Sequence, residues 1–274
     1  MGYEVIKVDI ADGIGLVTFN RPEKRNAMNP RFIEEMTRVL AEVRYDDSVR
    51  VLVLTGAGTA FCAGMDLKEF FHDNRADPAR FDSLFRASIE WRMRTLRYFP
   101  KPTIAMVNGF CFGGAFPIVE ACDLAFCAED ATFGLSEINF KLFPGGAVSK
   151  SLANLFRPRD ALFYGLTGRP FDGRTAERIG FVNRALPATT LRAETMAIAA
   201  EIAQKDAFAL KATKESYRYC LEMTSEAAIN YAAAKEAELI LRQQDRWREE
   251  GIPDFLAGKF KPGLEGHESV GKDR

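Results

Sequence analysis

The sequence lacks the charge excess and the histidine clusters that typify nucleic-acid-binding and metal-dependent proteins. Its 274 residues carry 37 basic and 38 acidic side chains, so no net field attracts nucleic acid or an anionic membrane. The two histidines, His72 and His267, lie far apart and have no metal-ligand spacing. We therefore expect no nucleic acid, no membrane and no metal among its partners.

Cysteine is scarce, and its spacing indicates neither a disulfide framework nor a metal site. The five are an odd set without a CxxC pair and lie mostly in apolar runs: Cys62, Cys111, Cys122, Cys127 and Cys220. Buried thiols suit a reducing compartment. Residues 1–10 alternate apolar and charged side chains, unlike a signal peptide, and the apolar run 103–119 is interrupted by glycines and Pro117. These patterns predict a cytoplasmic protein whose run 103–119 is buried core.

The hydrophobic pattern predicts an α/β fold. Apolar alternation on both sides of the turn at Asp12 and Gly13 predicts a β-hairpin, and helical spacing over 30–45 precedes an apolar strand. Beyond residue 145 the pattern is almost entirely helical. The elements expected are strands 5–9, 14–19, 51–54, 103–107 and 123–128, and helices 30–45, 79–98, 159–166, 174–179, 191–204, 208–220 and 225–246. We predict a core domain over residues 1–195 and a helical assembly region over 196–274.

Two glycine-containing turns precede predicted helices, at 56–69 and 108–116. In the first, Asp66 and Glu69 have the spacing of a capping box; in the second, Gly113 and Gly114 allow close approach to a ligand. Either turn alone is more typical of an ordinary helix start. Together they provide two backbone N–H donors, which enolate chemistry at a thioester carbonyl requires.

Four segments resemble those of the crotonase (enoyl-CoA hydratase/isomerase) superfamily, in the usual order: 20–28 (NRPEKRNAM), 61–67 (FCAGMDL), 105–109 (AMVNG) and 131–137 (ATFGLSE). The resemblance covers about residues 3–187 and extends more loosely beyond. It implies a crotonase fold, in which repeated ββα units form a spiral core followed by a C-terminal helical trimerisation region. It also implies an acyl-CoA substrate, a homo-oligomer (a trimer or a dimer of trimers) and no cofactor beyond the coenzyme A moiety of the substrate.

The resemblance assigns roles to particular residues. Met65 and Gly114 would supply the oxyanion-hole N–H groups, and Lys24, Ala63 and Leu67 would lie along coenzyme A. Glu137 would be the general acid/base, and its apolar neighbours should raise its pKa toward the operating pH. An arbitrary loop glutamate is more often a surface residue, but its place in the motif favours catalysis.

The second carboxylate of the two-glutamate hydratases is missing, because Pro117 stands at that position. Proline is tolerated in the first turn of a helix, so the replacement keeps the structure while removing an acid/base group. Glu120, three residues on, is an alternative carboxylate on the same helix face, although its position is usually a packing site in the family.

Within the superfamily, segments 51–70, 101–114, 135–139 and 261–264 resemble the hydroxycinnamoyl-CoA hydratase-lyases. This implies that Glu137 hydrates an arylpropenoyl-CoA, after which retro-aldol cleavage gives an aromatic aldehyde and acetyl-CoA. The expected substrate-binding residues are Phe70, Phe112, Ser136 and Phe140.

Two tyrosines that hold the phenol in those enzymes are absent, because Phe70 and Ala233 stand in their positions. Tyr231 lies on roughly the opposite helix face from Ala233. An acyl group without a free phenol is therefore indicated. A plain enoyl-CoA hydratase or isomerase acting on a bulky group is the alternative, and a noncatalytic acyl-CoA-binding protein of crotonase fold is a third.

Overall fold

The computed structural model describes residues 2–259, which divide into a unit ending at Ala207 and a second unit beginning at Phe208. The strands are β1 (Ile6–Ala11), β2 (Ile14–Phe19), β3 (Val51–Gly56), β4 (Ala60–Cys62), β5 (Thr103–Val107), β6 (Phe110–Phe112), β7 (Leu124–Ala128), β8 (Thr132–Gly134), β9 (Phe171–Asp172) and β10 (Arg184–Leu186). The α-helices are α1 (Pro30–Arg44), α2 (Pro78–Ile89), α3 (Phe116–Ala121), α4 (Ala147–Leu155), α5 (Pro158–Thr167), α6 (Gly173–Arg178), α7 (Ala188–Ala203), α8 (Ala207–Cys220), α9 (Ser225–Gln243) and α10 (Ile252–Leu256). Short 3₁₀ or π segments are η1 (Pro22–Lys24), η2 (Leu67–His72), η3 (Glu90–Leu96), η4 (Gly113–Ala115), η5 (Ser136–Phe140) and η6 (Trp247–Gly251).

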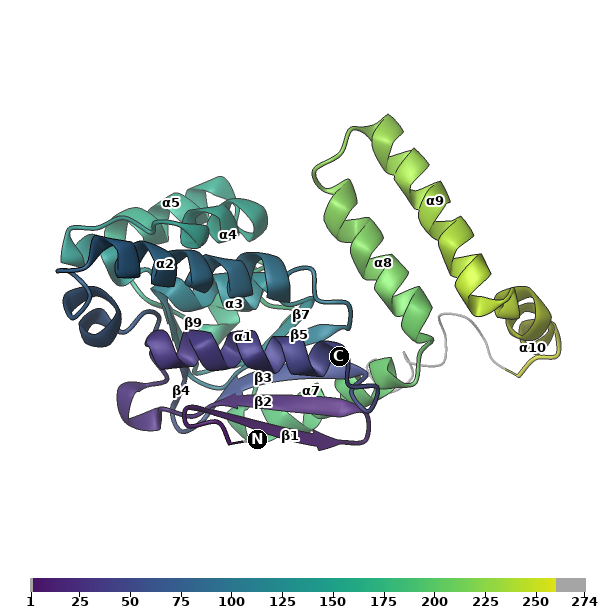
Figure 1. Ribbon diagram of the computed structural model, residues 1–274, viewed down its shortest axis with the longest axis horizontal. Helices are drawn as coiled ribbons and strands as arrows, with labels where there is room; N and C mark the ends of the chain where they lie inside the picture. The colour runs from purple at the N-terminus through teal and green to yellow at the C-terminus, as the bar shows by residue number, and fades with distance from the viewer. Residues whose placement is uncertain (1, 260–274) are drawn as a thin grey trace. The chain divides into compact units, whose positions relative to one another are not determined.

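A six-stranded sheet in the order β1-β2-β3-β5-β7-β10 is the centre of the first unit. Its first pair is the predicted hairpin, which turns at Asp12 and Gly13, both with positive φ as a tight hairpin turn requires. The remaining pairs are parallel. Every residue of β3 is buried, so both faces of the sheet are covered. Helix α7 packs against β2, β3, β5 and β7, and Figure 1 shows α1 lying along the same sheet.

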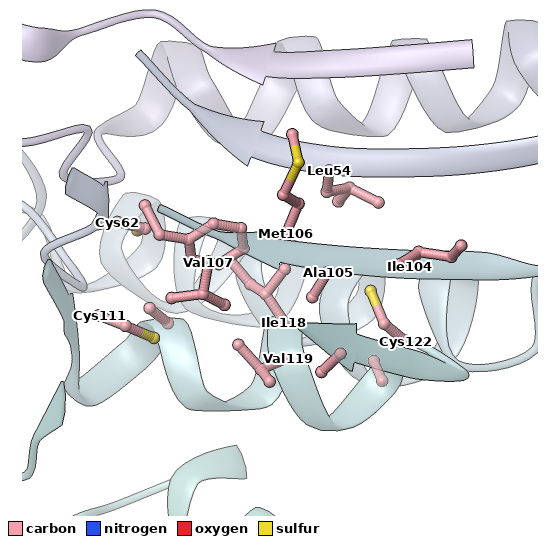
Figure 2. Close-up of a cluster of buried hydrophobic side chains, with 14 of the residues drawn as sticks. Leu54, Cys62, Ile104, Ala105, Met106, Val107, Cys111, Ile118, Val119 and Cys122 are labelled. Carbon is pink, nitrogen blue, oxygen red and sulfur yellow. The ribbon is translucent and has the colours of Figure 1, made fainter. Parts of the chain in front are cut away.

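Helix α1 begins where the sequence predicts. The side chain of Asn29 accepts a hydrogen bond from the Phe32 N–H, and Pro30 occupies the first turn, where its missing N–H leaves no bond unmade. The predicted apolar stripe is buried, with Met36 and Leu40 fully inaccessible. Figure 2 shows a neighbouring part of the core, where Leu54 of β3, Val107 of β5 and Ile118 of α3 gather. The run 103–119 is therefore mostly core, as predicted, with residues 108–110, 112 and 114 half-buried.

A second, small sheet has the order β4-β6-β8-β9. Strands β4, β6 and β8 pair in parallel, and β9 joins β8 in the antiparallel direction. Each strand has only two or three residues. This sheet was not predicted, because runs so short show no periodicity.

The second unit contains α8, α9, η6 and α10. Figure 1 shows α8 and α9 side by side, and the ion pair between Glu215 and Lys235 (2.7 Å) connects them. The rings of Tyr219 and Tyr231 lie 5.5 Å apart in the same helix pair. The predicted boundary at residue 195 falls inside α7, whose Leu191, Thr195 and Ala199 are buried in the first unit.

Most predicted elements are present, with one change of helix type. The helix expected over 79–98 is α-helical only to Ile89 and continues as the π segment η3. The resembling segment 261–264 and His267 lie outside the described residues. None of the helices within residues 2–259 combines the length and the apolar composition needed to cross a membrane.

Candidate active site

The candidate site lies where three neighbouring parallel strands end. Strand β4 leads into Ala63–Met65, β6 into Gly113 and Gly114, and β8 into Ser136 and Glu137. The carboxyl ends of adjacent parallel strands meet at one edge of a sheet, which is where ligands bind in many α/β proteins. The small sheet therefore brings together the three segments that the sequence singled out.

Backbone pairing with Met28 fixes the turn at Met65. The N–H of Met28 donates to the Gly64 carbonyl (2.8 Å), and the N–H of Asp66 donates to the Met28 carbonyl (2.9 Å). Because successive peptide groups of an extended segment alternate in direction, the N–H of Met65 faces away from Met28. Gly64 has a φ of +89°, and a Cβ there would lie 2.8 Å from the Phe112 carbonyl oxygen, so only glycine fits.

Gly114, the second donor expected from the sequence, lies in the first turn of η4. An N–H group in a first turn has no acceptor within its own helix. The two turns are in contact, since a Cβ placed on Gly64 would lie 3.3 Å from Gly114 N, and one placed on Gly114 would lie 3.1 Å from Met65 Cγ. The two N–H groups are therefore available beside each other.

Asp66 caps η2, as predicted, by accepting from the N–H groups of Lys68 (3.1 Å) and Glu69 (2.9 Å). The prediction of a full capping box is wrong, because the reciprocal hydrogen bond from the Asp66 N–H to the Glu69 carboxylate is not formed. The Asp66 N–H is taken by Met28, and the Glu69 carboxylate accepts instead from Arg21 (2.7 Å) and Asn29 (2.7 Å).

Arg21 ties the segment 20–28 to this cap. Its guanidinium donates to the Ala27 carbonyl (2.6 Å), to Asp66 Oδ2 (3.1 Å) and to Glu69. The side chains of Arg21 and Asp66 are only 7% and 9% exposed. This buried pair holds the Met65 turn against Met28.

We expect Arg21→Met to lower the free energy of unfolding by about 3–5 kcal/mol, because Asp66 would keep a buried charge without its cation. Urea denaturation followed by circular dichroism measures the change. Arg86→Met, which removes an exposed i,i+4 partner of Asp82, is the control and should leave the midpoint unchanged. Equal midpoints for the two variants would contradict the role of Arg21.

Glu137 packs directly on Gly113. A Cβ on Gly113 would lie 2.5 Å from Glu137 Oε1, and Gly113 has a φ of +44°. Desolvation by burial raises the pKa of Glu137 above the ordinary 4.5. Among the described residues, Glu137 Oε2 has no hydrogen-bond partner although it is buried. A desolvated carboxylate with a free oxygen is suited to accept and return a proton.

A cavity of about 480 Å³ opens between these groups. Its wall contains most of the predicted site residues: Met65, Gly114, Glu137, Ala63, Leu67, Phe112, Ser136 and Phe140. Two predicted residues are not in the wall. Lys24 is exposed at the end of η1, and Phe70 is fully buried behind Phe71, with ring centroids 5.0 Å apart.

The wall also contains residues that the sequence did not single out. Arg25 stacks over the Phe110 ring at 4.5 Å, and Phe71, rather than Phe70, faces the cavity. The other additions include Phe85, Ser88, Ile89, Arg92, Leu142 and Val148. Helical spacing would have placed Ser88 and Arg92 on one face, but nothing in the sequence indicated what that face covers.

Pro117 fills the first turn of α3, as predicted, and provides no acid or base. Glu120 is excluded as its substitute. It is buried in an ion pair with Arg97, accepts from Asn154 (2.9 Å), and is absent from the cavity wall. Glu137 is therefore the one carboxylate in the wall formed by the described residues.

The fold and the site define an enzyme-like arrangement in which paired N–H groups stabilise a carbonyl oxyanion and a carboxylate moves a proton. The chain belongs to the enoyl-CoA hydratase/isomerase family, which it matches over residues 9–264, and is a crotonase-type acyl-CoA enzyme.

Similar proteins support the same family. The chain is 45% identical over 267 residues to hydroxycinnamoyl-CoA hydratase-lyase of Pseudomonas fluorescens, covering 97% of each. It is 34% identical to "Probable enoyl-CoA hydratase echA8" of Mycobacterium tuberculosis, covering 84% of this chain and 88% of that one. A crystal structure of enoyl-CoA hydratase from Mycobacterium smegmatis superposes with a TM-score of 0.84 at 28% identity, covering 93% and 97%.

Proposed function

We propose that this enzyme hydrates an arylpropenoyl-CoA thioester and then cleaves the product to an aromatic aldehyde and acetyl-CoA. The observation that carries the proposal is Glu137, the one carboxylate of the described wall, which is desolvated and lies with the Met65 and Gly114 turns in an aromatic-lined cavity. The 45% identity to a hydroxycinnamoyl-CoA hydratase-lyase over nearly the whole chain supports the reaction.

The N–H groups of Met65 and Gly114 bind the thioester oxygen in this proposal. Negative charge develops on that oxygen when water adds to Cβ and when the Cα–Cβ bond breaks, and fixed donors stabilise it without reorganising. Ala63 and Leu67 contact the pantetheine arm. Arg25 of the wall and its exposed neighbour Lys24 carry positive charges that would complement the coenzyme A phosphates.

In the hydration step Glu137 takes a proton from water as the water oxygen bonds to Cβ. The electron pair of the double bond moves through Cα to the thioester oxygen, giving an enolate in the hole. The protonated Glu137 then delivers its proton to Cα, which completes the β-hydroxyacyl thioester and restores the carboxylate.

In the cleavage step Glu137 takes the β-hydroxyl proton. The Cα–Cβ bond breaks, its electron pair forms the acetyl-CoA enolate in the same hole, and the aldehyde leaves. Protonation of Cα by Glu137 yields acetyl-CoA and again restores the carboxylate. One acid/base group therefore serves both halves of the reaction, in keeping with Pro117 at the position of the second carboxylate.

The cavity favours an aromatic or bulky apolar acyl group. Phe71, Phe112 and Phe140 offer flat apolar surface, and the wall formed by the described residues contains no tyrosine. Phe70 and Ala233 replace the phenol-binding tyrosines of the hydratase-lyases. We infer an aryl ring without a free phenol.

The second candidate is a plain enoyl-CoA hydratase or isomerase that stops at a rearranged thioester. The observation in its favour is the missing tyrosine pair, because the resemblance implies that those tyrosines hold the phenol of a hydroxycinnamoyl substrate. The likeness to enoyl-CoA hydratases is compatible with it.

The deciding experiment incubates the purified protein with crotonyl-, cinnamoyl-, 4-hydroxycinnamoyl- and feruloyl-CoA. Loss of the enoyl absorbance reports turnover, and mass spectrometry identifies the products. We expect aromatic aldehyde and acetyl-CoA in equal amounts, fastest with cinnamoyl-CoA. A hydrated or isomerised thioester without aldehyde would contradict cleavage and establish the second candidate.

We also propose that the protein assembles as a trimer or a dimer of trimers. The helices of the second unit leave large apolar side chains exposed, including Ile229 (64%), Leu241 (80%) and Leu256 (77%). Exposed apolar side chains of this size support an assembly face on these helices. Sedimentation velocity at micromolar concentration tests the proposal, and a monomer would contradict it.

A further inference from the structure

Arg92 is a buried arginine in the wall of the acyl cavity. It lies on η3 and is only 5% exposed. Its guanidinium is held on three sides: Nε donates to the Ser88 carbonyl (2.7 Å), Nη2 to Ser88 Oγ (3.1 Å) and Nη1 to the Gly114 carbonyl (2.6 Å). The last contact joins it to the residue whose N–H is the second oxyanion donor.

No carboxylate neutralises Arg92 within residues 2–259. The other buried arginines of the core unit behave differently, since Arg21 pairs with Asp66 and Arg97 pairs with Glu120. Burial lowers the pKa of Arg92 to about 10, so the group remains charged at neutral pH. An unpaired buried charge is costly, and packing alone does not explain its presence.

We propose that Arg92 is a positioning residue, which holds Gly114 through its carbonyl oxygen and keeps a positive charge beside the enolate oxygen. The inference rests on the proposed oxyanion hole. During reaction the negative charge moves from Glu137 to the thioester oxygen. Arg92 Nη1 donates to the Gly114 carbonyl, and a Cβ on Gly114 would lie 3.2 Å from that nitrogen, so the cation lies beside the residue that is the proposed second donor. In a desolvated cavity such a fixed charge acts strongly.

The test measures the acidity of a bound β-ketoacyl thioester, for which acetoacetyl-CoA is the probe. Loss of its Cα proton gives a conjugated enolate with its own ultraviolet band, and the oxygen occupies the same hole without turnover. A pH titration of the complex gives the enolate pKa. A cation beside the oxygen lowers this pKa, and a merely structural arginine leaves it unchanged.

We expect Arg92→Gln to raise the enolate pKa of the bound probe by about one to two units. Its kcat with an enoyl-CoA substrate should fall about 10- to 100-fold, with KM within about threefold of wild type. Arg92→Lys keeps a cation and should recover part of both losses. Arg94→Gln is the matched control: Arg94 lies on the exposed face of η3, paired with Glu90, and its removal should change neither quantity.

An unchanged enolate pKa in folded Arg92→Gln would overturn the proposal. If that variant does not fold, Arg92→Lys and Ser88→Ala replace it, because each loosens the hydrogen bonds around the side chain of residue 92. A rise of at least about 0.3 unit in the enolate pKa of the bound probe in both variants supports the role. No rise in either variant overturns it. Failure of the oxyanion hole itself is distinguishable, since wild-type enzyme would then bind acetoacetyl-CoA without lowering its pKa below the value in water.

Discussion

Glu137→Gln should lower kcat by about 1,000-fold while leaving the fold and the dissociation constant for coenzyme A thioesters nearly unchanged. General acid/base catalysis contributes about 100- to 10,000-fold, and no other carboxylate of the described wall can replace it. Steady-state kinetics and calorimetric titration measure the two quantities. Glu129→Gln, which removes a partner of Arg174 away from the cavity, is the control. Turnover within tenfold of wild type would eliminate Glu137 as the acid/base group.

The ionisation of Glu137 should also determine the acid limb of the pH–rate profile. Glu137 must be ionised to accept a proton, so kcat falls as the pH drops through its pKa, which burial places above 4.5. The profile of wild-type enzyme should therefore bend at a higher pH than an exposed glutamate would give. An acid limb with an apparent pKa at or below 4.5 would show that the titrating group is exposed to solvent.

The raised pKa also affects stability. The folded-state pKa of Glu137 exceeds the unfolded-state value, so folding favours the neutral form. That contribution is fully present below the unfolded pKa and is lost as the pH rises through the folded pKa. We expect Glu137→Gln to unfold at higher urea concentration than wild type at pH 7, with the difference vanishing at acidic pH.

Gly113→Ala should lower kcat by about 100-fold, because the new methyl group cannot share space with the catalytic carboxylate. Its Cβ would lie 2.5 Å from Glu137 Oε1, at a backbone φ of +44° that alanine rarely adopts. A displacement of about 1 Å of a catalytic group costs about this factor. Stopped-flow kinetics under single-turnover conditions separates the chemical step from product release.

Gly165→Ala is the matched control for this variant. Gly165 lies inside α5, and its added Cβ would meet Pro144 at an ordinary 3.9 Å. The control should keep wild-type kcat and gain slightly in stability, since alanine favours helix. Wild-type kcat in Gly113→Ala would show that Glu137 reacts from another position.

The sequence predicted five of the six strands of the large sheet, all but the three-residue β10, and the long helices, because these have long periodic patterns. The stripe of α1 and the hairpin β1–β2 are examples, and the glycine turns marked two segments that line the cavity. The small sheet was missed because β4, β6 and β8 are too short to repeat any pattern. Without that sheet, the meeting of the three segments that follow β4, β6 and β8 could not be explained from the sequence.

The substrate-facing residues were less predictable than the chemical ones. Phe70 was expected in the cavity, but a π-helical turn directs Phe71 there instead. The sequence did not indicate a role for Arg92, because the proposed role depends on contacts with Ser88 and Gly114 that cannot be inferred from residue spacing. Glycines in the sequence indicate where backbone N–H groups are exposed in turns, whereas the side chains that line a cavity depend on how the helices pack.

The small sheet also separates two parts of the cavity. The proposed N–H donors and Glu137 follow β4, β6 and β8, whereas much of the acyl wall comes from α2, η3 and residues 140–148. Substitutions in that wall, other than at Arg92 and its partner Ser88, can therefore change which acyl group fits without moving the donors. The acyl specificity of this scaffold can be engineered separately from its chemistry.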